Sequence, residues 1–448
     1  MAMIEQRPST DSFEFHHAVS PEGAVEAEAR FGELKFRLLQ KLLSDLDPAK
    51  VRLQGNTRET IEEVATQMIG AEGVPLPRAV RARLISELLD EILGYGPLEP
   101  LLANPSVSEI MVNSPEEVYV EREGMIVLSE VTFRDDAHIM SMVEKILAPL
   151  NKRIDESSPM VDARLPAGYR VNVIIPPLAV KGPAITIRKF FNERVNMDYL
   201  VTIGTLTPDV SDFLKACIES RLNLLICGGT GTGKTTTLNA LSAFIPEGER
   251  VITIEDPAEL QLKRKHVVSL ETRPPNIEGK NQVTQRELVI NALRMRPDRI
   301  ILGEVRGGEA FDMLQEMNTG HDGSICTVHA NSPRDGLARI ENMVLMSGFD
   351  LPVRAIREQI ASAIHGIVHL TRMRDGKRRV TQISEVVGME EQHITMQDIF
   401  VFEQEGIDSE GQVLGQLNPT GIRPRFMDKI EQGGIRLDPR TFRKSGGW

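Results

Sequence analysis

One glycine-rich segment constrains the fold of this chain more than any other part of the sequence. It runs from Asn223 to Thr237 and joins an apolar stretch, a run of glycines and threonines, and the start of a helical pattern. Within it, Gly228 to Thr235 fits the phosphate-binding pattern G-x-x-x-x-G-K-[ST]. The glycines let backbone N–H groups turn toward an anion, because no Cβ blocks positive φ or close approach. A chance glycine-rich turn would lack this strand before the motif and this helix after it.

The same motif predicts ligands for ATP and for Mg²⁺. The helix after the loop adds the positive end of its dipole to the phosphate site. We expect Lys234 to reach the β- and γ-phosphates and the hydroxyl of Thr235 to bind Mg²⁺. The predicted nucleotide-binding residues are Gly228, Gly229, Thr230, Gly231, Thr232, Gly233, Lys234, Thr235 and Thr236.

The charge and the cysteine content of the chain disfavour several classes of protein. The net charge of -12 argues against broad nucleic-acid binding, although a local basic channel stays possible. The three cysteines form no C-x-x-C pair, which fits a reducing cytoplasm and predicts no cysteine-based zinc site. No apolar run approaches the roughly 18 residues of a membrane span, and the polar start of the chain has no signal-peptide pattern. We therefore expect a cytoplasmic protein without membrane insertion, whose membrane role would depend on partners.

The pattern along the chain predicts five parts. Residues 1–27 are polar and are predicted to be disordered. Three apolar stripes at helical spacing in 28–93 predict a helical bundle. Short strands and one helix in 94–191 predict an α+β domain, and 192–205 is a candidate linker. Residues 206–448 are predicted to form the nucleotide-binding α/β domain with a C-terminal extension.

Strands that alternate with helices set the fold class of the larger domain. Apolar strands are expected at Val251–Ile254, Arg299–Leu302 and Thr327–His329, with helices between them. This alternation predicts a doubly wound, largely parallel sheet, an α/β fold. In such sheets ligands bind beyond the carboxyl ends of the strands, so polar residues that follow each strand should converge on the phosphate loop.

Acidic residues at two strand ends are candidates for catalysis. Glu304 could hold water on Mg²⁺ or orient the attacking water, and Gly303 stands where many P-loop ATPases have the Walker-B aspartate. Glu255 is a second candidate, with Asp256 and Glu259 nearby. The alternative for this second group is that its acids only favour a helix start.

Two histidines and three arginines carry weaker signals. His321 and His329 could sense a γ-phosphate, or one could be structural and the other exposed. A zinc site that includes Cys326 matches no standard spacing. Arginine is suited to stabilise γ-phosphate charge. Taken alone, however, Arg164, Arg170 and Arg188 fit the ordinary polar face of a half-exposed sheet.

Four segments in order resemble the type II/type IV secretion ATPase superfamily. They match its Walker A, Asp box, Walker B and His box, within a resemblance that spans roughly 94–402. The chain lacks the four-cysteine zinc motif of the general secretion and type IV pilus extension ATPases. Further segments, among them the tail Gly421-Ile422-Arg423-Pro424-Arg425-Phe426, look like the tight-adherence (Flp) pilus branch. The four segments are the phosphate loop, 254–259, 294–307 and 319–331.

The resemblance implies a RecA-like ATPase core, a PAS-like N-terminal domain and a ring-shaped homohexamer, and the helical bundle is compatible with the tight-adherence branch. It implies that ATP hydrolysis drives pilin assembly through an inner-membrane platform protein, at the cytoplasmic side of that membrane. Mg²⁺ would be held by Thr235 and Glu304. The N-terminal lobe would close over the nucleotide with its arginines. The implied catalytic residues are Glu304, Glu255, Arg164, Arg170, Arg188, His321 and His329.

Two alternatives stay open at this stage. A conjugation-type secretion ATPase that moves DNA or protein would share the same core, although the acidic charge and the tail disfavour it. A nucleotide-binding scaffold without turnover is the other alternative. The intact set of Lys234, Thr235 and Glu304 disfavours that scaffold.

Overall fold

The chain forms two compact units, Met1–Phe191 and Asn192–Trp448. The computed structural model describes residues 21–45, 57–73, 76–122, 124–150, 152–189, 195–262, 264–275 and 279–444. Most of the expected disordered segment 1–27 lies outside these ranges, but a helix begins at Pro21. The finer division of the chain at 93/94 and 205/206 stays a prediction.

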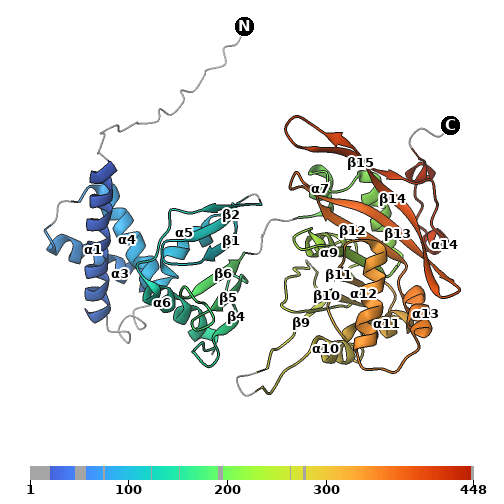
Figure 1. Ribbon diagram of the computed structural model, residues 1–448, viewed down its shortest axis with the longest axis horizontal. Helices are drawn as coiled ribbons and strands as arrows, with labels where there is room; N and C mark the ends of the chain where they lie inside the picture. The colour runs from blue at the N-terminus through green and yellow to red at the C-terminus, as the bar shows by residue number, and fades with distance from the viewer. Residues whose placement is uncertain are drawn as a thin grey trace, which may run out of the picture. The chain divides into compact units, whose positions relative to one another are not determined.

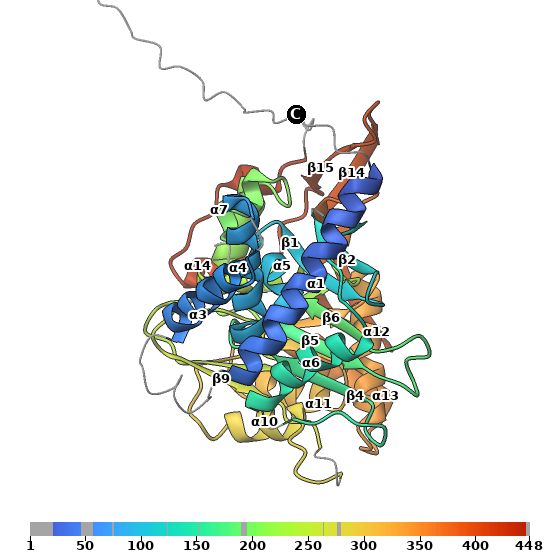
Figure 2. The same ribbon diagram turned by 90° about the vertical axis from the view of Figure 1, so that its left-hand side faces the viewer.

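Three helices open the N-terminal unit, as the apolar stripes predict. Figure 2 shows α1 passing beside α3 and α4. Leu38, Leu42, Ala65, Leu84 and Leu88 are all fully buried between them. Helical spacing places these side chains on the facing sides of the helices, so burying them holds the bundle together. The helices are α1 (Pro21–Asp45), α3 (Thr57–Ala71) and α4 (Arg78–Leu93).

A six-stranded antiparallel sheet forms the rest of this unit. Its strand order is β3-β2-β1-β6-β5-β4, and helices α5 and α6 contribute to the cluster that covers one face. On the other face, alternate side chains such as Asn172 and Thr186 are exposed. The expected α+β domain is confirmed, while its PAS-like identity stays a prediction. Its elements are η1 (Gly96–Leu98), α5 (Glu99–Ala103), β1 (Val107–Val112), β2 (Val118–Arg122), β3 (Met125–Leu128), α6 (Asp136–Leu147), η2 (Ala148–Leu150), β4 (Met160–Arg164), β5 (Arg170–Ile174) and β6 (Ala184–Arg188).

The second unit is built on a nine-stranded sheet in the order β15-β14-β13-β12-β7-β11-β10-β8-β9 (Figure 1). The strands from β12 to β9 in this order pair in parallel, and β13, β14 and β15 pair antiparallel. The prediction of a largely parallel sheet is therefore correct for the part that holds the phosphate loop. The strands are β7 (Leu224–Gly228), β8 (Val251–Glu255), β9 (Val267–Glu271), β10 (Arg299–Val305), β11 (Ile325–His329), β12 (Gly366–Arg372), β13 (Arg378–Glu390), β14 (His393–Ile407) and β15 (Val413–Pro419).

Helices cover both faces of this sheet, which makes it doubly wound. Side chains of α7, α8 and α9 join the cluster on one face, and those of α10 to α13 join the cluster on the other. Both clusters include residues of the central strand β7, so this strand is buried on both faces, as its unbroken apolar sequence indicates. The helices are α7 (Met197–Thr202), α8 (Pro208–Glu219), α9 (Lys234–Ser242), α10 (Gln285–Ala292), α11 (Glu309–Asn318), α12 (Pro333–Met346) and α13 (Val353–Ala363).

Two regions differ from the sequence-based expectation. The expected linker 192–205 contains helix α7, where Asn196 caps the first turn through the amide of Tyr199. The C-terminal tail shows little pattern, yet it adds strand β15, helix α14 (Met427–Gln432) and the turn η3 (Pro439–Phe442). Pairing with the long strand β14 orders β15, and this kind of long-range support leaves no periodic signal in the tail itself.

The central strand β7 is anchored at its start by one buried amide side chain. Asn223 Oδ1 accepts hydrogen bonds from the amides of Gly323 (2.7 Å) and Ser324 (3.1 Å). Its Nδ2 donates to the carbonyls of Ala363 (2.8 Å) and Met317 (3.5 Å). One side chain thus connects the strand of the phosphate loop to α11, α13 and the turn before β11.

Candidate nucleotide-binding site

The phosphate loop joins β7 to α9, as the motif predicts. Gly228 ends the buried strand, and Lys234 begins the helix. Gly233 precedes the helix with φ 95°, and Gly231 has φ 69°, both in the left-handed region that favours glycine. The loop therefore has the backbone conformation that turns successive N–H groups toward one point.

Close approach of the chain explains the first glycine of the motif. A Cβ on Gly228 would lie 2.5 Å from the carbonyl oxygen of Leu370 and 2.6 Å from Thr232 Oγ1. Leu370 lies on the adjacent strand β12 and Thr232 lies within the loop, so any side chain at position 228 would displace the loop. The glycines leave a cradle lined by backbone, which fits a phosphate group.

The motif lysine is positioned over this cradle. Lys234 Nζ donates to the carbonyls of Gly228 (3.0 Å) and Gly229 (2.9 Å). These bonds hold the ammonium group at the loop, where a phosphate would compete for it. Thr235 and Thr236 follow in the first turn of α9, with Thr235 half-buried and Thr236 exposed.

Sheet register brings other predicted residues to the same edge. His329 at the end of β11 pairs with Gly228, and β10 and then β8 follow on the far side of β11. Because these strands are parallel, Glu304 and Glu255 lie at the edge that carries the phosphate loop. Strand β10 runs on to Val305, so Glu304 lies within the strand and does not end it.

The structure separates the acids of the second strand. Glu255 is 2% exposed, and its Oε1 accepts hydrogen bonds from the amides of Glu259 and Leu260, both 2.9 Å. Asp256 is exposed and accepts from Thr272 Oγ1 (2.6 Å). Only Glu255 of this group therefore combines burial with a fixed orientation.

Glu255 also explains why β10 lacks the Walker-B aspartate. A Cβ on Gly303 would lie 2.8 Å from Glu255 Cγ and 3.1 Å from its Oε1. The carboxylate of β8 thus occupies the space that a side chain at 303 would need. A carboxylate is present beside Gly303, but it comes from the neighbouring strand.

Glu304 has a cationic partner in its own chain. Arg306 Nε donates to Glu304 Oε2 at 2.8 Å, and an Arg306 Nη2 contact supports it. The carboxylate is partly exposed, so water can reach it. A carboxylate in this position could orient water, with Arg306 fixing the direction of the side chain.

The two histidines lie at opposite ends of β11, which corrects the expectation that both lie near the phosphates. His329 ends the strand beside Gly228, whereas His321 precedes the strand. The turn after His321 binds Asn223 at the start of β7. Within the strand alone, Ile325 and His329 lie about 13 Å apart at the usual rise, and His321 precedes Ile325. Both histidines follow β10 in the chain. Strand β11 runs toward the edge of the sheet that carries the phosphate loop, so only its final residue, His329, reaches that edge.

The three predicted arginines form one row across the N-terminal sheet. Arg170 pairs with Arg164 on one side and with Arg188 on the other. Directly opposed residues share a face with Cβ atoms about 5 Å apart, and like charges at that distance repel. Arg170 lies 3.7 Å from Asp162 and Arg188 lies 3.3 Å from Glu109, which offsets part of the repulsion. The row is suited to an anionic ligand.

A basic hairpin beside the phosphate loop is a feature that the sequence reasoning missed. Arg378 Nε donates to the carbonyl of Gly231 (2.9 Å), and a Cβ on Gly231 would lie 3.8 Å from Arg372 Nη1. The signal was a run of arginines and a lysine directly after the apolar strand β12. These cations add positive charge on the side of the loop opposite His329.

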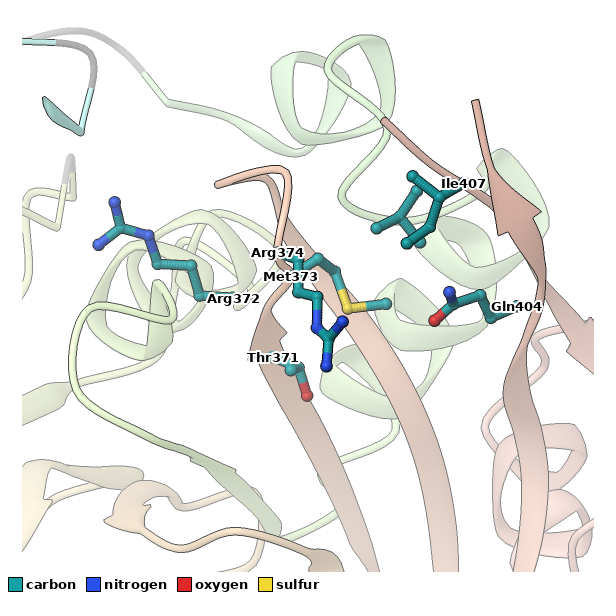
Figure 3. Close-up of a pocket in the computed structure, with 7 residues that line it drawn as sticks. Thr371, Arg372, Met373, Arg374, Gln404 and Ile407 are labelled. Atoms are coloured by element: carbon teal, nitrogen blue, oxygen red, sulfur yellow. The ribbon is translucent and has the colours of Figure 1, made fainter. Parts of the chain in front are cut away.

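A pocket of about 420 Å³ lies on the other side of this hairpin. In Figure 3, Met373 and Gln404 point toward one another, while Arg372 extends away from them. The pocket therefore shares the hairpin with the phosphate loop but does not form part of the cradle. It is lined by Thr371, Arg372, Met373, Arg374, Gln404, Ile407 and Val413.

Neither a membrane-spanning helix nor a ready-made metal centre occurs in the described part of the chain. No helix there is long and apolar enough to cross a membrane. Groups of three or more His, Cys, Asp or Glu side chains placed to hold a metal ion are absent from the same residues. The expected Mg²⁺ ligands Thr235 and Glu304 form no such group, and their role stays a prediction.

Comparison with known proteins gives a consistent result. Residues 91–412 match the family of type II/IV secretion system proteins, and 31–93 match the N-terminal domain of type II secretion system protein E. A candidate conjugal transfer protein of Mycobacterium tuberculosis is 36% identical over 303 residues, covering 66% of this chain and 86% of the relative.

Two further relatives come from other bacteria. The conjugal transfer protein TrbB of Rhizobium radiobacter is 33% identical over 315 residues, covering 69% of this chain and 93% of the relative. The type IV secretion system protein VirB11 of Bartonella quintana is 33% identical over 327 residues, covering 64% and 90%.

The contact between Gly303 and Glu255 makes a prediction about stability. Gly303→Ala should lower the free energy of unfolding by about 1–3 kcal/mol, because the added methyl group overpacks the buried carboxylate. It should also reduce ATP turnover by displacing Glu255. Denaturant unfolding measures the first effect. Gly248→Ala is the control, since a Cβ there meets no atom within 4 Å. Equal stability of the two variants would contradict the steric argument.

Glu316, a buried acid bonded to the turn that follows His321, predicts that the stability of the fold depends on pH. Burial raises the pKa of Glu316 to about 8, and Ser324 Oγ donates to its Oε1 at 2.6 Å. Between pH 4.5 and 8 the unfolded chain loses this proton while the folded chain keeps it, so this carboxyl lowers stability as pH rises.

Glu316→Gln should remove that contribution. The variant should gain stability relative to the wild type at pH 8 and show a smaller difference at pH 5. Melting temperatures across this range provide the measurement, with the exposed Glu410→Gln as control. A difference between variant and wild type that is independent of pH would show that Glu316 is ionised in the folded state.

Proposed function

The chain belongs to the type II/IV secretion system protein family, and we propose that it is an ATP-hydrolysing motor of the conjugation type within a type IV secretion system. The phosphate loop carries this proposal, because its glycines, Lys234 and the following helix form a cradle for nucleotide phosphates. The names of the relatives support the conjugation type. Two of them are described by conjugal transfer, and the chain covers 86% and 93% of their lengths.

The chemistry of the site fits ATP hydrolysis. The loop amides and Lys234 would bind the phosphates, and Thr235 with Glu304 would hold a Mg²⁺ ion and its water shell. Mg²⁺ would neutralise charge on the β- and γ-phosphates. Glu304, whose carboxylate is held by Arg306, would orient the attacking water. Glu255 on β8 would form a rigid part of the site wall, because backbone amides fix its carboxylate. His329 would sense the γ-phosphate from its place beside Gly228.

Assembly of a tight-adherence pilus is the second candidate function. It is favoured by the tail motif at 421–426, which lies outside the family match at 91–412. In the structure this tail is part of the domain. The amide of Phe426 donates to Glu385 Oε1 (3.0 Å), and its ring stacks on Phe213. The names of the relatives favour conjugal transfer over this pilus function, and an experiment in cells tests the choice between the two.

We further propose that the working form is a homohexamer that acts with membrane partners at the cytoplasmic side of the inner membrane. A closed ring satisfies every head-to-tail interface, and a motor with six sites can act in sequence. Native mass measurement with an ATP analogue tests the number of subunits. The acidic net charge disfavours direct nucleic-acid contact over the whole surface, so any DNA cargo would be moved through partners.

The assigned site makes a prediction about turnover. Lys234→Ala should lose nucleotide binding, because it removes the cation at the cradle. Glu304→Gln should keep ATP binding and lower kcat by about 10²-fold or more, since only the water-directing charge is removed. Phosphate release and ATP affinity are measured on the same preparations.

An exposed acid on the same sheet provides the control for this pair. Glu403→Gln should hydrolyse ATP like the wild type, because Glu403 lies on β14 and bonds Asn418. Wild-type turnover by Glu304→Gln would rule out its assigned role. No phosphate release by the wild type, with or without Mg²⁺ and DNA, would instead favour a nucleotide-binding scaffold. A deletion strain that transfers DNA normally but lacks pili would select the pilus function.

The arginine row makes a separate kinetic prediction. We propose that Arg164, Arg170 and Arg188 stabilise γ-phosphate charge. Each single change to Ala should lower kcat more than it weakens ADP binding, because ADP lacks the γ-phosphate. Arg122→Ala, on β2 of the same sheet but outside the row, is the control. Equal losses of kcat and of ADP affinity would indicate a general role in binding or folding.

A further inference from the structure

The edge strand β3 of the N-terminal sheet is unusually apolar and unusually open. It is the outermost strand on one side of the sheet. All four of its side chains are exposed: Met125 67%, Ile126 63%, Val127 40% and Leu128 58%. Natural sheets protect their edges with charges, prolines or covering segments, because an open apolar edge pairs with other chains. Within the described residues, β3 carries none of these protections.

Both faces of this strand are available to a partner. Ile126 pairs with Glu121 and Leu128 with Tyr119, so these two side chains lie on the polar face of the sheet. Met125 and Val127 alternate to the other face. The strand therefore offers a row of backbone donors and acceptors along its outer side, with apolar contacts above and below.

Acidic side chains surround this strand. Glu121 lies on the neighbouring strand, opposite Ile126. Exposed Glu116 and Glu117 precede β2, and exposed Glu130 follows β3. Arg122 is the one cation among the described residues of 113–130. Because the four glutamates outnumber it, the edge attracts a cationic segment and repels an acidic one.

The charge around β3 also indicates which kind of chain can pair with this edge. A second copy of the chain would place the same four glutamates against their own counterparts, which opposes pairing of β3 with β3. A strand that carries lysines or arginines between apolar residues would satisfy the apolar side chains, the backbone groups and the charge together. Such addition of an extended segment to an open sheet edge is a common mode of recognition.

We propose that β3 is the docking edge for an extended segment of a partner protein in which apolar residues alternate with lysines or arginines. The segment pairs with the outer side of β3 as an added strand. Its apolar residues contact Met125 and Val127 on one face, and its cations lie on the other face, beside Ile126 and Leu128 and near Glu121 and Glu130. This proposal concerns the N-terminal sheet alone and does not depend on the proposed function.

A peptide of about eight residues that alternates valine and lysine, within the usual length of a strand, is the probe. Its binding to the full chain is followed by fluorescence anisotropy, beside a peptide with glutamate in place of lysine. The wild type should bind the lysine peptide more tightly, and added salt should weaken this binding because it screens the charges. Equal affinity for the two peptides, or no binding of either, would overturn the proposal.

Ile126→Lys tests the edge itself. It should weaken binding of the lysine peptide by about tenfold or more, because it removes apolar contact and adds a like charge, a loss equivalent to about 1.4 kcal/mol. Val180→Lys is the matched control. Val180 is an apolar side chain of the same unit, 93% exposed and outside β3. Equal affinities of the two variants would contradict a role for β3. ATP turnover should be unchanged in both.

Glu121→Lys distinguishes docking from a folding defect. This variant should lose affinity for the lysine peptide and gain affinity for the glutamate peptide, a reversal that misfolding does not produce. An unchanged preference would remove Glu121 from the site and overturn the proposed charge recognition. Native mass is measured alongside. A wild-type assembly that falls apart in Ile126→Lys but not in Val180→Lys would show that copies of the chain occupy the edge.

Discussion

The hydrogen bonds of Asn223 are the interaction on which the rest of the second unit depends. This fully buried side chain accepts two backbone amides and donates to two backbone carbonyls, so it uses its full capacity at the start of β7. The partners come from α11, from the turn before β11 and from the end of α13. The strand that leads into the phosphate loop is thereby fixed in register with its neighbours. At its other end Gly228 meets Leu370 closely, so both ends of the strand are determined.

The sequence was most informative where function imposes a local pattern. The phosphate loop, its strand and its helix follow from residues that are adjacent in the chain. The position of His321 relative to the phosphate loop could not be predicted from such a local pattern. Its distance from the phosphate edge depends on where β11 begins, and strand boundaries are set by pairing across the sheet.

Residues that meet across strands were the part that sequence patterns could not supply. The arginines at 164, 170 and 188 look like unrelated polar positions, yet register aligns them in one row. Arg378 lies far from the phosphate loop in the chain but bonds Gly231 within it. In both cases a one-residue shift in register would send the side chain to the other face of the sheet, so the site depends on pairing that no local pattern encodes.

The carboxylate beside Gly303 comes from β8 and not from β10, and this has a consequence for how the site can evolve. Gly303 and Glu255 share one volume, and only one of the two positions can carry a large side chain. A lineage that restored an acid at 303 would first pass through an overcrowded intermediate, and one that first shortened Glu255 would pass through an intermediate with a cavity and unsatisfied backbone amides. Each single step is costly, although the two end states contain the same number of acids. The pair is therefore expected to change together or to stay as it is, and an acid missing from one strand of a related protein should prompt a search for its counterpart on the next.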